Sequence, residues 1–337
     1  MSPDRLVTAT RKRIAQAAQI ACLLEVSAPK PGNVNRHNDF ADACFEDFLL
    51  SAVAIGPAME NAGLAGVGQT VWRAIRDARR LVRSNTNLGM VLLLAPLAKA
   101  CLRVPHLPRL GTGLGNTATV GIGQLRKSLA QVLAALTVED ARQAYAAIRL
   151  ARPGGLGQTS QADIAEEPSI TLYQAMALAQ ERDAIAREYV TDFAITFEIG
   201  YPALKDAWHA SGSLSTAIVQ AYLTILAQVP DTLIARKRGA DMASQVSQWA
   251  DNVLAMGGVF AAQGQAGLAE LDRALRDEGH TLNPGATADL TAASIFLLLL
   301  YDCQVPVATG IDQRASSVSF AQPDGKSFIR IQFCTVD

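Results

Sequence analysis

Charge is scarce in this sequence, and neither sign dominates. Lysine and arginine number 30 and aspartate and glutamate 31, so the formal net charge is −1, and 18% of the 337 residues are charged. A chain without a basic or acidic excess has no overall attraction to nucleic acid or to a membrane surface. We therefore expect no nucleic-acid or membrane partner, and any anionic substrate must be held by local cations.

Cysteine is infrequent, and its spacing excludes two common uses. The five cysteines are odd in number, contain no C-x-x-C pair and lie mainly in apolar helical patterns. A disulfide framework or a zinc site needs paired or closely spaced cysteines. We therefore expect free thiols in a reducing compartment, and a cytoplasmic protein.

Long apolar runs are also absent. The most apolar stretch, LTAASIFLLLLY, lies between Asp289 and Asp302, and this length predicts a buried helix because it is too short to cross a bilayer. The N-terminal residues spread their basic side chains through an amphipathic pattern, which is not that of a signal peptide. The glycines of GTGLG at 111–115 follow no strand pattern and do not form a dinucleotide-binding fingerprint.

What the sequence does contain is helical periodicity. Half of the residues are apolar, and they recur near every 3.6 positions along most of the chain. No flexible linker or internal repeat divides it, so we expect an all-α fold with a single domain over residues 1–337. The expected helices cover residues 4–27, 44–63, 66–83, 87–103, 117–135, 138–150, 170–180, 182–210, 214–228, 240–263, 266–278 and 286–303.

The C-terminal tail has a different pattern. In SVSFAQPDGKSFIRIQF, a Pro-Asp-Gly turn signal separates two segments in which apolar residues alternate, which is typical of a hairpin. We expect a short β-hairpin over residues 318–333 that closes a cleft formed by the helices.

Polar loops interrupt the helices at 29–40 (PKPGNVNRHNDF), 83–89 (RSNTNLG), 152–158 (RPGGLGQ) and 283–290 (NPGATADL). Pro29 and Pro31 cannot lie inside a helix, so the helix that carries Glu25 should end near Ala28 and leave Lys30 on a stiff loop. Each loop taken singly reads as an ordinary helix connection. Together they offer glycines and helix starts that can approach an anion such as phosphate.

These loops also carry a resemblance. Glu25 followed by PKPGNVNR, then NTNLG, GGLG, RDAIAREYVTDF, PDTLIARKRG and NPGATADLTAASIFL, resemble in order the landmarks of the triphosphoribosyl-dephospho-CoA synthase family. The resemblance extends over residues 20–300. It implies an all-α enzyme in which ATP loses adenine while its triphosphoribosyl group passes to the ribose 2′-hydroxyl of dephospho-CoA.

The sequence departs from that pattern at 85–89. Where the family has an Asn-Thr-His-Lys-Gly run, this chain has Asn-Thr-Asn-Leu-Gly, so two potential cations are missing. The TNLG form resembles relatives from organisms that use tetrahydromethanopterin. This leaves open a ribitol-containing precursor as the acceptor, with Leu88 packing either on its aromatic ring or in the core, and phosphoribosyl diphosphate as the donor.

Ribosyl transfer passes through a cation-like centre at C1, so the site needs carboxylates, a base and cations for the phosphates. We expect Glu25, Asp42 and Asp289 to be catalytic. The alternatives are a helix-end charge for Glu25, and helix-start charges for Asp42 and Asp289. His37 is a further candidate base that the resemblance does not support. The residues expected to bind substrate are Lys30, Gly32, Asn33, Arg36, Asn85, Thr86, Asn87, Gly89, Gly155, Asp231, Arg236, Pro284 and Gly285.

A magnesium ion is expected at Asp39, Asp42 and Asp192, because Mg²⁺ is held by a few carboxylates together with substrate phosphates. The alternative role of Asp39 and Asp42 is to cap a helix. Asp231, expected to bind substrate, has the same alternative. Asp183, Glu188 and Asp192 spread over a broad helix face, so only one or two of them can reach a common ligand. The oligomeric state is left open between monomer and homodimer. A non-catalytic nucleotide-binding protein is the rival to an enzyme.

Overall fold

The computed structural model describes residues 3–104, 115–153, 163–302, 320–321 and 328–329. Up to residue 302 the regular structure of these residues is helical, as the periodicity predicts. The helices are α1 (Pro3–Ser27), α2 (Phe45–Ala54), α3 (Gly56–Glu60), α4 (Val67–Arg79), α5 (Leu88–Cys101), α6 (Gly115–Ala134), α7 (Val138–Ala151), α8 (Leu172–Ala179), α9 (Ala184–Val190), the π-helix η1 (Ile195–Gly200), α10 (Tyr201–Ser211), α11 (Leu214–Gln228), α12 (Thr232–Arg238), α13 (Ala240–Ala255), the 3₁₀-helix η2 (Gly258–Phe260), α14 (Ala262–Leu275) and α15 (Gly285–Tyr301).

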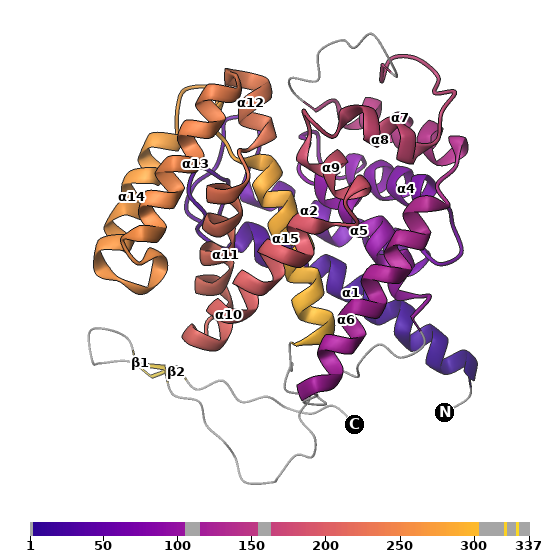
Figure 1. Cartoon of the computed structure of the whole chain (residues 1–337), viewed down its shortest axis with the longest axis horizontal. Coiled ribbons are helices and arrows are strands. Elements are labelled where there is room, and N and C mark those ends of the chain that lie inside the picture. Colours follow the sequence, from indigo (N-terminus) through magenta and orange to yellow (C-terminus); the bar gives the residue numbers. More distant parts are fainter. Residues whose placement is uncertain (1–2, 105–114, 154–162, 303–319, 322–327, 330–337) are drawn as a thin grey trace.

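Helix α15 runs through the middle of the molecule. Figure 1 shows it between one group of helices, α10 to α14, and a second group that includes α1 and α4 to α9. It packs against α1, α5 and α11. Every residue from Ala286 to Tyr301 is buried except Asp289, and the buried apolar side chains form one continuous core. Asp289 is only partly buried because it lines a cavity at the N-terminal end of α15.

The single helix predicted over 182–210 is wrong, because the chain breaks after α9 and then continues as a π-helix before α10. α9 ends at Val190, and Asp192 and Phe193 adopt left-handed backbone angles with φ of 49° and 59°. The buried carboxylate of Glu188 then accepts the backbone N–H groups of Ile195 at 3.0 Å and Thr196 at 2.7 Å. These bonds hold the start of η1 and replace the continuous helical ladder.

Two other predicted helices have different boundaries. The range 44–63 divides into α2 and α3 at Ile55, next to Pro57 in the first turn of α3. The range 240–263 ends early, since α13 stops at Ala255, and Gly257 and Gly258 take positive φ values of 95° and 54°. Left-handed angles are cheap only for glycine, so this pair ends the helix.

The C-terminal hairpin predicted over 318–333 is wrong as stated. Within that range the structure describes only two segments of two residues each, β1 (Phe320–Ala321) and β2 (Phe328–Ile329), which pair antiparallel. The remaining residues of the range lie outside the described part of the chain. A pair this short is far below the size of a sheet that is stable by itself, so the described residues do not form the predicted hairpin.

The described cysteines, Cys22, Cys44 and Cys101, form no disulfide with one another. Among the helices that the structure describes, none has both the length and the apolar composition of a membrane span, and only α11 and α12 taken together, bent by 54°, meet that description.

Candidate active site

A cavity of about 650 Å³ lies where the polar loops meet the N-terminal end of α15. Its wall is formed by residues from the loop after α1, the start of α5, the helices α7 to α9, the end of α12 and the segment 279–289. Elements far apart in sequence therefore contribute to one concave site. This size suits a small organic ligand.

Asp289 and Gly89 face each other on the cavity wall. A side-chain carbon built on Gly89 would lie 2.0 Å from Oδ2 and 2.4 Å from Cγ of Asp289. Only a residue without Cβ leaves room for the carboxylate, which explains the glycine in the first turn of α5. The carboxylate is thereby directed toward the helix start and the cavity.

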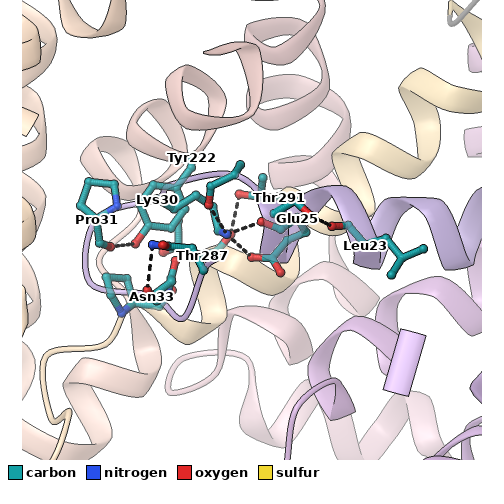
Figure 2. Close-up of polar contacts among 12 residues, drawn as sticks. Leu23, Glu25, Lys30, Pro31, Asn33, Tyr222, Thr287 and Thr291 are labelled. Carbon is teal, nitrogen blue, oxygen red and sulfur yellow. Dashed lines mark hydrogen bonds and ion pairs between the residues drawn. The ribbon is translucent and has the colours of Figure 1, made fainter. Parts of the chain in front are cut away.

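Glu25 reaches the cavity from the last turn of α1, and behind it lies a fully buried lysine (Figure 2). The Nζ of Lys30 is 2.9 Å from Oε1 of Glu25, and the two side chains are 0% and 3% exposed. The same ammonium donates to the backbone carbonyls of Glu25 and, at 3.4 Å, of Ala28. Lys30 therefore satisfies the last carbonyls of α1 and neutralises its terminal carboxylate.

The two carboxylates differ in electrostatic environment. Burial raises the pKa of Glu25, and the ammonium of Lys30 acts in the opposite direction. Burial also raises the pKa of Asp289 well above its ordinary value, and the negative charges of Glu25 and Asp231 raise it further. The backbone N–H of Met90 opposes this rise only weakly. Two neighbouring acids with unlike surroundings titrate as a coupled pair.

The loop after α1 is fixed by contacts with the C-terminal half of the chain. Gly32, at φ 75°, donates its N–H to Oδ1 of Asp272 at 2.8 Å. Tyr222 donates its hydroxyl to the carbonyl of Pro31 at 2.8 Å, and Asn33 donates its side-chain amide to Oδ1 of Asn283 at 2.6 Å. These bonds, some of them drawn in Figure 2, hold the Lys30 segment against α14, α11 and the segment before α15.

The structure brings together ten of the residues selected from the sequence. The cavity is lined by Glu25, Asn33, Asp42, Asn85, Thr86, Asn87, Gly89, Arg236, Gly285 and Asp289. The side-chain amide nitrogen of Asn87 is buried and makes no hydrogen bond within the described residues, so it is available to a ligand. Arg236 is paired with Asp183 at 2.7 Å.

Other selected residues lie elsewhere. Lys30 is enclosed behind Glu25, Gly32 lies against Leu275 and Pro284, and Pro284 itself is buried outside the cavity lining. Arg36 and His37 are exposed on the loop surface. Gly155 lies outside the described residues. A direct contact of Lys30 with a phosphate is therefore excluded in this conformation.

Asp231 is a structural residue in this arrangement. Its Oδ1 accepts the N–H groups of Leu233 at 2.8 Å and Ile234 at 3.1 Å, which caps α12. Its Oδ2 accepts the N–H and the hydroxyl of Thr287, both at 2.8 Å. With all four bonds made and 1% exposure, Asp231 joins α12 to α15 and offers nothing to a substrate. The capping alternative explains its place in the sequence.

The three carboxylates expected to hold Mg²⁺ do not converge. Asp39 accepts the N–H of Phe45 at 2.8 Å and so supports the start of α2. Asp192 lies at the break after α9, where its carbonyl accepts Nε of Arg126 at 3.0 Å, and only Asp42 lines the cavity. In the described part of the chain no three metal-ligating side chains cluster. The residues therefore do not form a protein cage for Mg²⁺.

Several cavity residues were not selected from the sequence. Arg152, Arg182 and Lys237 add positive charge to the wall, and neither Arg152 nor Arg182 forms an ion pair with a residue that the structure describes. Phe40 and His280 stack at 3.8 Å between ring centroids and 16° between planes, which joins the loop after α1 to the segment before α15. Arg182 is the first residue of the quoted RDAIAREYVTDF segment and Arg152 the first residue of the polar loop RPGGLGQ, so the sequence offered a signal for both.

Two curated proteins are similar to this chain in sequence. A probable 2-(5″-triphosphoribosyl)-3′-dephosphocoenzyme-A synthase from Pseudomonas savastanoi pv. phaseolicola is 26% identical over 297 residues, which cover 85% of this chain and 90% of that protein. A protein of the same description from Malonomonas rubra is 32% identical over 111 residues, or 33% of each chain.

The crystal structure of a protein described as a putative triphosphoribosyl-dephospho-CoA synthase from Archaeoglobus fulgidus superposes with a TM-score of 0.55 at 29% identity. The match covers 75% of this chain and 99% of that one. The model of the CitG family, ATP:dephospho-CoA triphosphoribosyl transferase, matches residues 11–305. That range includes every described cavity residue. The fold, the order of the polar loops and this match together show that the chain belongs to the ATP:dephospho-CoA triphosphoribosyl transferase family and is a transferase.

Proposed function

We propose that this enzyme transfers the triphosphoribosyl group of ATP to a hydroxyl of dephospho-CoA and releases adenine. The observation that carries the proposal is the pair of carboxylates, Glu25 and Asp289, on the wall of one cavity that also holds cationic side chains. Ribosyl transfer develops positive charge at C1′ between a leaving base and an attacking hydroxyl. Carboxylates at that point stabilise the transition state and manage the protons.

The polyphosphates of the two substrates require positive charge that is not already neutralised. Arg152 and Arg182 meet this requirement among the described residues, whereas the charge of Arg236 is offset by Asp183. A guanidinium binds phosphate in bidentate fashion. We therefore assign the triphosphate of ATP to the wall formed by the end of α7 and the start of α9.

The less polar part of the acceptor requires an apolar surface, and α8 provides one. Leu172, Ala175 and Met176 line the cavity together with Leu88. This wall accommodates the pantetheine arm of dephospho-CoA, and it accommodates the aromatic part of a ribitol-containing acceptor equally well. The alternative acceptor therefore gains no separate support, and dephospho-CoA remains the proposed one.

Magnesium is proposed to enter with the donor. Mg²⁺ commonly keeps several waters and binds through one or two carboxylates plus substrate phosphates, and Asp42 is the expected metal ligand that lines the cavity. If it bridges Asp42 and the triphosphate, D42N should weaken ATP binding in the presence of Mg²⁺, while D39N should not.

The test is product mass spectrometry with ATP, Mg²⁺, dephospho-CoA and a ribitol-containing acceptor offered together. The expected result is free adenine and a triphosphoribosyl adduct on dephospho-CoA. An adduct on the ribitol compound alone would overturn the acceptor. Binding of ATP without release of adenine would overturn the reaction and favour a nucleotide-binding protein.

A further inference from the structure

The buried Lys30 beside Glu25 has a consequence for the chemistry of the cavity. The ammonium is completely enclosed, lies 2.9 Å from Oε1 of Glu25 and donates to two backbone carbonyls (Figure 2). A charge in this position cannot contact solvent or substrate. Its electrostatic effect falls on the carboxylate that separates it from the cavity, because unscreened charges interact strongly.

Asp289 has the opposite surroundings. The ionisable groups that act on it are Glu25 at the end of α1, Asp231 before α12 and Asp183 before α9, and all of them are acidic. Asp183 is paired with Arg236. Cys22 on α1 and Tyr222 on α11 also lie near enough to Glu25 to feel its charge, and burial raises the pKa of both. Among the described residues, Lys30 is the cation in direct contact with Glu25, whereas no ion pair joins a cation to Asp289.

We propose that Lys30 is a positioning residue that holds Glu25 as the ionised base of the site and leaves Asp289 as the protonated acid. This assignment rests on the proposed ribosyl transfer for its catalytic meaning. Two acids whose surroundings differ in this way divide the acid and base roles between them. The charge pattern itself follows from the contacts alone.

The step balances without any co-reactant. The bond between C1′ of the ribose and N9 of adenine breaks with its electron pair on the base, and the base takes the proton of Asp289. The acceptor hydroxyl oxygen forms the new bond to C1′ and gives its proton to Glu25. After release of adenine, one proton passes from Glu25 to Asp289 through solvent, and the starting state is restored.

The role of Asp289 is tested with two donors. D289N should slow adenine release from ATP by about 10² to 10⁴, the usual contribution of general acid catalysis. The triphosphate of N7-methyladenosine has a base that is already cationic and needs no proton, so D289N and the unmodified enzyme should use it at rates within about tenfold of each other. E25Q should remain slow with both donors. If D289N lost the same factor in rate with both donors, the assignment of Asp289 as the acid would be overturned.

The role of Lys30 is tested by infrared spectroscopy, which does not depend on turnover. At neutral pH, K30M should gain one carbonyl band of a protonated carboxylic acid, because Glu25 loses its counter-ion, and the double variant E25Q/K30M should lack that band. D289N should lack one such band that the unmodified enzyme has. A purely structural role for Lys30 would leave the bands of a folded K30M unchanged and would overturn the proposal.

The kinetic profile completes the test. In K30M the acidic limb of kcat/KM against pH should move up by about one unit or more. If K30M does not fold, the two-donor comparison with D289N still decides the assignment. Should the enzyme transfer no ribosyl group at all, the infrared bands would still report the charge pattern, so failure of the proposed function and failure of this inference are distinguishable.

Discussion

Gly89 controls where the carboxylate of Asp289 lies. Because a Cβ at this position would lie 2.0 Å from Oδ2, G89A should displace the carboxylate and lower kcat by about 10² or more, as loss of a positioned catalytic group does. The thermal midpoint should stay near that of the unmodified protein, since alanine favours helix over glycine. Adenine release and a melting curve measure both quantities.

Gly123 supplies the matched control, because nothing lies within 4 Å of a Cβ built there. G123A makes the same change of residue within α6 and should leave kcat unchanged. Equal activity of G89A and G123A would show that the carboxylate does not need its observed position.

Glu188 gives the folded protein a pH dependence. Burial raises its pKa from 4.5 to about 7, so between these values the folded state keeps a proton that the unfolded state has lost. The free energy of unfolding should therefore fall as pH rises from 4.5 to 7, by at most about 3 kcal/mol from this residue. Urea unfolding at pH 5 and pH 7.5 measures the difference.

The variant E188Q should show a smaller fall over the same interval, because its side chain does not ionise. E198Q is the control, since Glu198 is 59% exposed and pairs with Arg126 at the surface. If the unfolding free energies of E188Q and E198Q both decreased with pH as much as that of the unmodified protein, the pH dependence would come from other residues.

The junction between α12 and α15 depends on a single side chain. D231A removes a cap from α12 and leaves the buried N–H and hydroxyl of Thr287 without their acceptor. These losses together should cost about 3 kcal/mol of unfolding free energy. D241A, at an exposed position in the first turn of α13, should cost less than about 0.5 kcal/mol.

Chemical denaturation measures both variants. If Asp231 instead bound the substrate, D231A would fold with normal stability and show only a raised KM for ATP. That result would contradict the structural role described above.

Both halves of the chain form the cavity wall, so ligand binding and folding of the whole molecule should be coupled. ATP at one hundred times its dissociation constant should raise the unfolding free energy by about 2.7 kcal/mol, and adenosine, which lacks phosphates, should have a smaller effect at the same concentration. Thermal melting with increasing ligand concentration measures this.

R182A should reduce the shift produced by ATP, because Arg182 lines the cavity and forms no ion pair within the described residues. R142A is the control, since Arg142 lies on the exposed face of α7 and is paired with Glu139. An unchanged shift in R182A would contradict the assignment of the triphosphate to that wall.

Local sequence determined much of the architecture. Apolar periodicity predicts most of the helices because each buried helix must present an apolar face, and the prolines at 29 and 31 place the end of α1 at Ser27. The break after α9 could not be predicted in this way. It depends on a bond network between Glu188 and residues seven and eight positions later, inside a segment whose periodicity is uninterrupted.

The polar loops could be identified from the sequence because glycine, proline and asparagine have local signatures. Described residues of these loops line one cavity. What their residues do there was decided by tertiary structure. Asp231 and Lys30 are both charged loop residues in a family motif, yet both are enclosed and paired. The charge state of Glu25 and Asp289 likewise depends on which groups pack beside them, since burial and neighbouring charges set a pKa, and these neighbours come from segments far apart in the chain.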